Sequence, residues 1–231
     1  MAKKVLLVLV LAAIVTGGAY AQLISQISFS AGGGGFIGGD FGGGIEMSQS
    51  GEKGSYEYPY FGGGGFIFCD ATYAELSLGF FGGSGKAKMS GGGQSAESDF
   101  SIASFNIGLL GKYPFAIDDN LTVFPLLGID YQIVLSFKDE DGDEHKDFDN
   151  NEAPGDFSAL WFKFGGGADY SLTGNIFLRA QALYGLRIPN KFENDMVDLF
   201  KELGSLSASS VDVKTLLGHG LTVKVAVGYR F

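Results

Sequence analysis

The chain has 231 residues, of which 45% are apolar and 38 are glycine, and its formal net charge at pH 7 is −10. An acidic chain is a poor partner for nucleic acid and for anionic membrane surfaces, because like charges repel. The single cysteine, Cys69, excludes an internal disulfide framework in an oxidising compartment, and we expect it to fill space on a strand.

The first residues have the pattern of an export signal. Lys3 and Lys4 precede an unbroken apolar run from Val5 to Val15, and Ala19-Tyr20-Ala21 fits a small-x-small cleavage site. Eleven apolar residues are too few for a membrane helix, which needs about 20. We therefore predict a cleaved signal peptide over 1–21 and one β domain over 22–231. Loss of the two lysines takes the net charge to −12.

Segments that alternate polar and apolar residues recur after the predicted cleavage site, and no run reaches 18 apolar residues. We expect strands at 25–44, 57–69, 72–82, 99–115, 121–137, 157–170, 175–187 and 219–231. The connections alternate between long (45–56, 83–98, 138–156, 188–218) and short (70–71, 116–120, 171–174). Membrane barrels have short periplasmic turns and longer outer loops. The pattern predicts an all-β, eight-stranded, antiparallel up-and-down transmembrane β-barrel with both termini in the periplasm.

Glycine runs, such as 32–35 and 62–65, allow two interpretations. They are flexible linkers, or they mark bends and close strand approach in a curved sheet. Neighbouring aromatic residues such as Phe36, Phe61 and Phe66 favour the curved sheet.

The predicted strand faces place charged residues inside the barrel. The inward set is Glu75, Asp130, Lys163, Asp169, Arg179, Arg187 and Lys224. In a narrow lumen such groups must pair, which indicates a rigid, salt-bridged plug. Alternatively, inward glycines widen the waist for water or a ligand; these are Gly79, Gly108, Gly128, Gly165, Gly167, Gly185 and Gly228. Aromatic girdles are expected from Tyr113, Phe115, Tyr170, Tyr229 and Phe231 at the periplasmic side, and from Tyr56, Tyr58 and Phe137 at the outer side.

Two outer segments have features of their own. In the acidic segment 138–152, Asp139, Asp141 and Asp143 have a spacing that Ca²⁺ could use, although the pattern does not match an EF-hand and a solvated loop is the simpler interpretation. In the last outer segment, Asn190 and Glu193 form a helix start, apolar residues follow at helical spacing, and Gly204 suits the helix end. We expect this short helix to lie across the barrel mouth as a lid, with packing on other loops or contact with a partner as alternatives.

Support for catalysis is weak. The histidines are His145 and His219, and Ser207, Ser209 and Ser210 precede His219 without a spacing that would bring a catalytic set together. We expect no enzyme and no cofactor.

The last residues, Leu221 to Phe231, alternate strictly, with apolar residues on one face and polar or small residues on the other. This segment resembles the closing strand of bacterial outer-membrane barrels, in which a terminal Phe is an assembly signal. The resemblance assigns that role to Tyr229 and Phe231, and implies the barrel-assembly machinery as a partner.

The chain as a whole is similar to the small eight-stranded outer-membrane barrels, such as the OmpA membrane domain, OmpX, OmpW and spirochaetal surface proteins. The resemblance implies a monomer in outer-membrane lipid, with a structural, surface-exposed role and acidic outer loops available to a host or environmental ligand. A narrow channel or a conduit for small apolar solutes is the alternative, and a lipid-modifying enzyme comes third. A soluble lipocalin-like barrel is disfavoured, because its outer face would leave a broad apolar belt in water.

Overall fold

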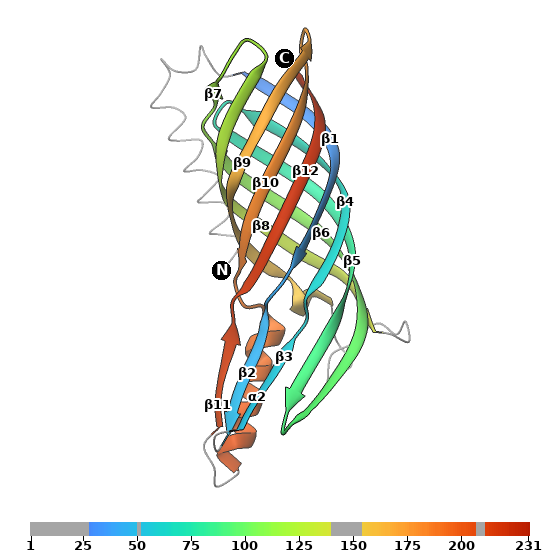
Figure 1. Ribbon diagram of the computed structural model, residues 1–231, viewed down its shortest axis with the longest axis vertical. Coiled ribbons are helices and arrows are strands. Elements are labelled where there is room, and N and C mark those ends of the chain that lie inside the picture. The colour runs from blue at the N-terminus through green and yellow to red at the C-terminus, as the bar shows by residue number, and fades with distance from the viewer. Residues whose placement is uncertain (1–27, 50–51, 140–153, 207–210) are drawn as a thin grey trace.

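A closed barrel of eight antiparallel strands forms the body of the molecule (Figure 1). The computed structural model describes residues 28–49, 52–139, 154–206 and 211–231. The barrel strands are β1 (Phe29–Asp40), β4 (Tyr60–Ala71), β5 (Ala74–Gly91), β6 (Gln94–Lys112), β8 (Leu121–Asp139), β9 (Ala159–Thr173), β10 (Ile176–Arg187) and β12 (Gly218–Arg230). Each pairs with the next along the chain, and β1 pairs with β12 to close the ring. The predicted fold class is confirmed.

One end of the barrel carries tight turns and the other carries a folded extension. The turn end holds residues 72–73, 117–120 and 174–175, with the two-residue strand β7 (Phe115–Ala116) beside β8. At the opposite end, β2 (Gly44–Gln49), β3 (Glu52–Glu57) and β11 (Val211–Leu216) continue the sheet in the order β11–β2–β3–β5. We call β2, β3, β11, the adjoining ends of β5 and β6, and the helix α2 (Lys191–Leu206) the outer platform.

Helix α2 lies along one face of this extension (Figure 1). Val197 packs against the fully buried Ile45 of β2 and the buried Val213 of β11, so the platform has an apolar core of its own. The predicted helix exists, but it does not lie across the mouth as a lid: it packs on the other outer segments. It also continues to Leu206, past the expected end at Gly204. No helix in the described part of the chain is long and apolar enough to cross a membrane.

Two predicted loops are hairpins. Residues 45–56 hold β2 and β3, and 83–98 hold the ends of β5 and β6. The turn between β5 and β6 uses Gly92 and Gly93 in the left-handed region, with φ of 59° and 78°. The loop prediction was wrong because this ribbon is polar on both faces and lacks an apolar face. The first strand is also shorter than predicted, and the first turn lies at 72–73 instead of 70–71.

The inward and outward faces agree with the predicted alternation along most strands. The exception is the outer end of β8, where a register irregularity against Ala103 and Ser104 leaves Leu135 as an extra residue and reverses the alternation. Phe137 is therefore buried inside, and Tyr58 is buried in the mouth. Neither belongs to the predicted outer girdle. Tyr56, the third expected member, is half-buried against Phe192.

Glycine is required where neighbouring strands approach closely. A Cβ at Gly64 would lie 1.7 Å from the carbonyl oxygen of Phe80, and one at Gly34 would lie 1.9 Å from that of Val225. By contrast, nothing lies within 4 Å of a Cβ at Gly82. Glycines of the first kind permit the strong curvature of a narrow barrel, which supports the curved-sheet interpretation.

Candidate functional site

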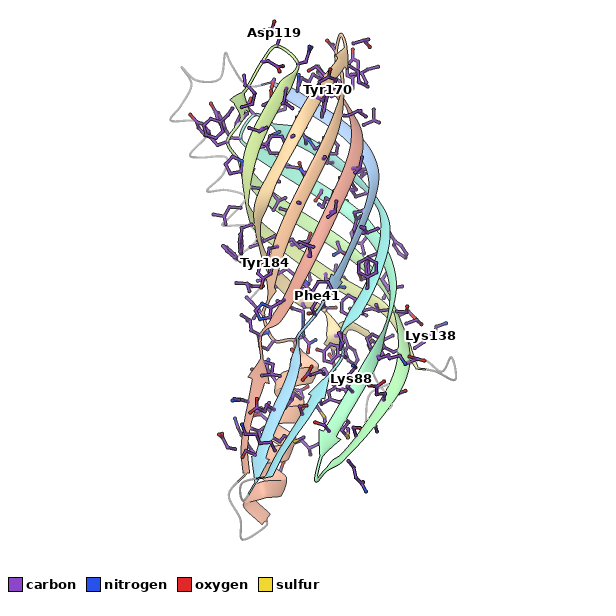
Figure 2. All side chains as sticks on the ribbon, viewed as in Figure 1. Phe41, Lys88, Asp119, Lys138, Tyr170 and Tyr184 are labelled. Carbon is purple, nitrogen blue, oxygen red and sulfur yellow. The ribbon has the colours of Figure 1, made fainter. Side chains whose placement is uncertain are left out.

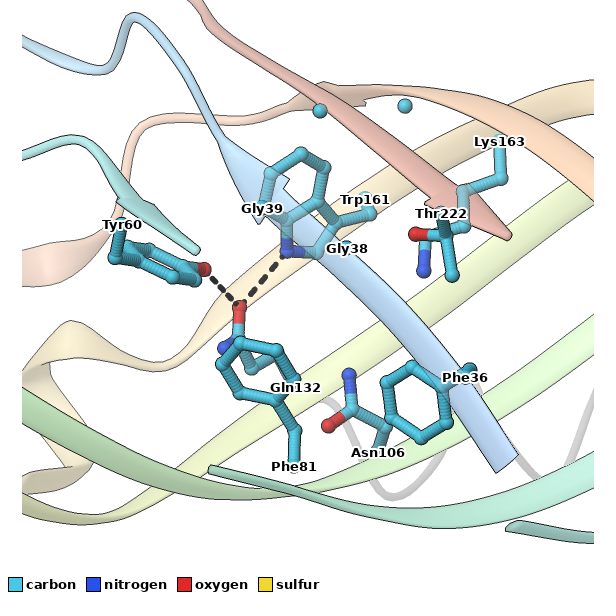
Figure 3. Close-up of a pocket in the computed structure, with 12 residues that line it drawn as sticks. Phe36, Gly38, Gly39, Tyr60, Phe81, Asn106, Gln132, Trp161, Lys163 and Thr222 are labelled. Atoms are coloured by element: carbon cyan, nitrogen blue, oxygen red, sulfur yellow. Dashed lines mark hydrogen bonds between the residues drawn. The ribbon is translucent and has the colours of Figure 1, made fainter. Parts of the chain in front are cut away.

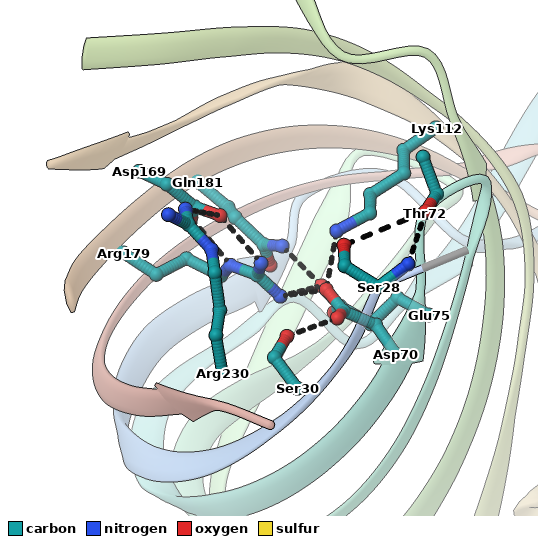
Figure 4. A network of polar contacts seen from close by, with 10 residues as sticks. All are labelled: Ser28, Ser30, Asp70, Thr72, Glu75, Lys112, Asp169, Arg179, Gln181 and Arg230. Carbon is teal, nitrogen blue, oxygen red and sulfur yellow. Dashed lines mark hydrogen bonds and ion pairs between the residues drawn. The ribbon is translucent and has the colours of Figure 1, made fainter. Parts of the chain in front are cut away.

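The lumen holds most of the buried polar chemistry of the molecule, and its turn end is organised around Arg179 of β10 (Figure 4). This guanidinium is 1% exposed. Nε and one terminal nitrogen each donate to a carboxylate oxygen of Asp169 at 2.7 Å, and the other terminal nitrogen lies 2.9 Å from Glu75 and 2.6 Å from Asp70. Lys112 also pairs with Asp70. The planar fork of arginine suits this two-sided arrangement, which a lysine could not reproduce.

Aromatic rings enclose the same guanidinium. The Cζ atom of Arg179 lies 4.4 Å from the ring centroid of Phe68, 5.1 Å from that of Phe177 and 5.4 Å from that of Phe124. These rings exclude water and add cation–π attraction to the ion pairs. This end of the lumen is therefore filled by a compact charged and aromatic layer.

At mid-height, a second polar group surrounds Asp130 of β8. Lys163 donates to one carboxylate oxygen at 3.1 Å, and the Asn106 amide donates to the other at 3.1 Å. Lys224 of β12 is also buried here, with its ammonium 4.9 Å from the ring centroid of Phe66.

Closer to the outer mouth than this group, Gln132 joins several strands through its amide (Figure 3). Its carbonyl oxygen accepts from the Tyr60 hydroxyl at 2.9 Å and from the Trp161 indole at 3.0 Å, and its NH₂ donates to Ser104 at 3.2 Å. Since Tyr60 and Trp161 come from opposite sides of the barrel, this amide crosslinks the wall.

The outer mouth is closed by Arg187 and the start of α2. Arg187 donates to both carboxylate oxygens of Glu193 at 2.9 Å and to Asp40 at 2.5 Å. Glu193 and Asn190 also form the expected helix cap, in which the backbone N–H of each residue donates to the side chain of the other at 2.9 Å. One carboxylate therefore caps the helix and neutralises the arginine.

A stack of rings covers this ion pair. Phe157 lies between Phe137 and Phe192, with ring centroids 4.4 and 4.6 Å apart, and Phe192 contacts Tyr58. Burial raises the pKa of the Tyr58 hydroxyl well above its ordinary value, and this hydroxyl accepts from the Asn190 amide. The start of α2 thus acts as a stopper, although the rest of the helix lies on the platform.

Two small cavities lie among the described side chains of the lumen. The cavity nearer the outer mouth measures about 40 Å³ and is bounded by Tyr60, Gln132 and Trp161 (Figure 3). The mid-height cavity measures about 20 Å³ and lies beside Lys224. A larger hollow of about 250 Å³ lies at the turn end beneath Arg179. A buried water needs about 10–15 Å³, so the two inner cavities hold a few waters at most.

The structure places all seven predicted lumen charges inside: Glu75, Asp130, Lys163, Asp169, Arg179, Arg187 and Lys224. The prediction missed Asp40, Asp70 and Glu193, which pair with them, and Lys112, which pairs with Asp70. Asp70 was placed in a turn, although it has the same parity as the inward Phe66 and Phe68. Asp40 follows a glycine run that shows no alternation of polar and apolar residues, so the sequence does not indicate whether Asp40 points inward. Glu193 was recognised only as a capping residue.

The predicted effect of the inward glycines needs correction. A Cβ at Gly167 would meet the ring of Phe124, one at Gly228 would meet Phe177, and one at Gly185 would meet Trp161. These glycines make room for aromatic rings, so they do not open the waist.

The other candidate residues do not form a site in the described part of the chain. Asp139 is the last residue of β8, and Asp141 and Asp143 lie outside the described residues, as do the signal segment, His145 and the three serines. No group of three or more metal-binding side chains occurs among the described residues. His219 lies on the outer face of the barrel, where Nδ1 is 2.6 Å from the Tyr184 hydroxyl. The predictions of a calcium site and of no enzymatic activity are untested.

The outer face of the barrel decides its surroundings. Apolar side chains are exposed on every barrel strand, among them Ile37, Ile67, Phe80, Ile107, Ile129, Phe162, Leu178 and Val225. Among the described residues, no charged side chain faces outward between the turns and the level of Lys86, Asp99 and Lys138 at the outer rim. Such a belt on a sheet without edges matches a hydrocarbon layer, in which every backbone group must be paired. The chain is a transmembrane β-barrel of the outer-membrane type.

Aromatic residues border this belt at both ends (Figure 2). Tyr170 lies at the turn end, and Phe41 and Tyr184 lie where the barrel meets the platform. At the closing strand, Tyr229 and Phe231 face outward with ring centroids 5.4 Å apart. Their position suits a girdle, and their role as an assembly signal stays a prediction.

No family model and no curated protein matches the sequence. The structure is similar to that of the outer membrane protein OprG from Pseudomonas aeruginosa, with 13% identity over 88% of this chain and 95% of that one and a TM-score of 0.45. It is also similar to that of Neisserial surface protein A, with 12% identity over 85% of this chain and 97% of that one and a TM-score of 0.41. For the attachment invasion locus protein Ail of Yersinia pestis, the identity is 14% over 88% of this chain and 99% of that one, and the TM-score is 0.34.

Proposed function

We propose that the protein is a non-conducting outer-membrane barrel that holds the outer platform at the cell surface for contact with another macromolecule. The observation that carries this proposal is the apolar core of the platform. Ile45 is 0% exposed, beneath Val197 and Val213. Segments that merely connect strands would not need a packed helix and three extra strands. A rigid, preorganised surface loses less entropy on binding than mobile loops do.

The filled lumen supports the same role. Ion pairs around Arg179, Asp130 and Arg187 occupy three heights, and aromatic rings lie between them. Opening a path would separate buried partners, which costs several kcal/mol for each pair. The barrel is therefore better suited to anchoring than to transport.

The chemistry of the partner is suggested by charge. The segment 138–156 is dense in carboxylates. On the platform, Glu46 lies 3.4 Å from Lys214 and 3.9 Å from Lys53, so that face is locally neutralised. An acidic segment in this chain, together with a platform of mixed charge, favours a partner that presents basic groups, because complementary charge speeds association.

A narrow conduit is the second candidate, favoured by the two inner cavities of about 40 and 20 Å³, which share Phe36, Asn106, Lys163 and Thr222 in their linings. Planar-bilayer recordings separate the two functions. We expect no unit conductance from the full-length protein; a steady unit conductance would favour the conduit.

The contact role is tested by removing part of the platform. Replacing residues 190–216 by a short Gly/Ser linker deletes α2 and β11 but keeps β10 and β12. Cells that display this variant should adhere less than wild-type cells to a panel of immobilised matrix and serum proteins. Shortening the β5–β6 tip at 90–95 is the matched control, because it removes an outer segment of the platform but keeps the apolar core around Ile45, Val197 and Val213. Equal adhesion of all three across the panel would contradict the proposal.

A further inference from the structure

The polar side chains around the mid-height cavity of the lumen can all donate hydrogen bonds, apart from the Asp130 carboxylate. Its lining includes Lys163, Lys224, Ser77, Thr222 and Asn106. Within the described chain, the Lys224 ammonium has no hydrogen bond and no carboxylate oxygen within the 4.0 Å limit of an ion pair, although the residue is only 5% exposed. The Ser77 and Thr222 hydroxyls line the same cavity.

The one carboxylate in this lining, that of Asp130, already accepts a hydrogen bond at each of its two oxygens. Asp130 accepts from Lys163 through one oxygen and from Asn106 through the other, both at 3.1 Å. The two buried acceptors that lack partners, Glu75 Oε1 and Gln181 Oε1, do not line this cavity. The lining of the cavity therefore holds two ammonium groups and one carboxylate, and Glu75, the other carboxylate whose charge acts on Lys224, lies outside the lining.

An unpaired buried ammonium is costly, and buried polar groups are nearly always satisfied by protein, water or an ion. The Phe66 ring, with its centroid 4.9 Å from Lys224 Nζ, offers only partial compensation. A volume of about 20 Å³ suits one small ligand. A water molecule would satisfy the hydrogen-bond donors but would leave the Lys224 ammonium without a contacting anion. An anion of similar size would satisfy the donors and would also contact the ammonium.

We propose that the barrel binds one small monovalent anion of halide size at mid-height, between Lys224 and Lys163, with the Ser77 and Thr222 hydroxyls as further donors. This site is independent of the contact role of the platform. The anion gives the Lys224 ammonium a directly contacting partner, and so stabilises the folded barrel by mass action.

Bromide is the direct probe. Crystals of the full-length protein grown in sodium bromide should show one anomalous peak in the lumen beside Lys224 Nζ. Clear density for water at that position, without an anomalous peak, would overturn the proposal.

Stability measurements test the same site in solution. The denaturant midpoint of the detergent-solubilised barrel should be higher in sodium chloride than in sodium gluconate at equal ionic strength, since gluconate is too large for the cavity. Lys224→Met should abolish this difference, and Lys88→Met, at an exposed lysine of β5, should preserve it. An equal midpoint in both salts for the wild type, or a chloride effect that persists in Lys224→Met, would refute the site. Should Lys224→Met fail to fold, the bromide map and the wild-type salt comparison still decide.

Discussion

Replacing Glu193 by alanine should release α2 from the barrel mouth while the barrel stays folded. The change removes two charge-assisted hydrogen bonds to Arg187 and the acceptor for the Asn190 N–H. Breaking a buried ion pair costs about 3–5 kcal/mol, and loss of a helix cap costs about 1 kcal/mol. Arg187 keeps Asp40 as a partner, which favours the lower end of the first range. We therefore expect about 4 kcal/mol in total, roughly a thousandfold change in an equilibrium constant.

This free energy should appear as local opening, because the lost contacts join α2 to the mouth and the backbone ladder of the barrel is untouched. Lys201, an exposed residue of α2, provides a tryptic site that reports the opening. Cleavage of native protein in lipid vesicles should be faster in Glu193→Ala by up to the same thousandfold, since the rate follows the population of the open form. The fluorescence of Trp161, the only tryptophan, should be unchanged, because its indole bonds Gln132 inside the barrel.

Two variants sharpen this test. Glu193→Gln keeps an acceptor for the Asn190 N–H but loses the charge, and its cleavage rate should lie between those of the wild type and Glu193→Ala. Asp195→Ala changes an exposed carboxylate of the same helix and should alter the rate by about twofold or less. If Glu193→Ala is cleaved no faster than Asp195→Ala, the stopper role of this ion pair is refuted. Loss of the Trp161 signal would instead show that the mouth holds the whole barrel together.

Three further predictions concern the wall and the turn end. Gly64→Ala should fail to give the heat-resistant folded band on gels, because its Cβ would lie 1.7 Å from the Phe80 carbonyl oxygen, and Gly82→Ala should fold normally; equal behaviour would contradict the curvature argument. Val225→Arg should destabilise the folded barrel in lipid vesicles by about 2–4 kcal/mol, whereas Val225→Leu should have little effect. Unchanged stability of Val225→Arg would contradict the membrane assignment. Arg179→Met should destabilise the barrel by about 3–5 kcal/mol in a guanidinium titration, because three carboxylates lose their shared partner; a neutral effect would show that Lys112 compensates.

The sequence was most informative where one face of a strand had to be apolar. In β8 to β12, the alternation around Asp130, Lys163 and Arg179 placed inward and outward residues correctly, because a charge facing lipid is expensive. The prediction failed where that constraint is absent. Beyond the membrane, the ribbon at 83–98 is solvated on both faces, so it carries no apolar alternation although it is a regular hairpin. A single extra residue at Leu135 then reversed the predicted direction of Phe137, and a local irregularity of this kind has no sequence signature.

The filling of the lumen shows why the alternation of inward and outward residues could not by itself predict whether the lumen is open or filled. Inward glycines were expected to leave space, yet at several of them a ring from another strand fills the place of the missing side chain: Phe177 of β10 against Gly228 of β12, and Phe124 of β8 against Gly167 of β9. These rings also enclose Arg179, so the glycines indirectly position the cation of the turn-end network. In a narrow barrel, glycine and aromatic residues thus form complementary pairs across neighbouring strands. A search for such pairs, together with inward parity, would have predicted a filled lumen and would have directed attention to the donors around Lys224.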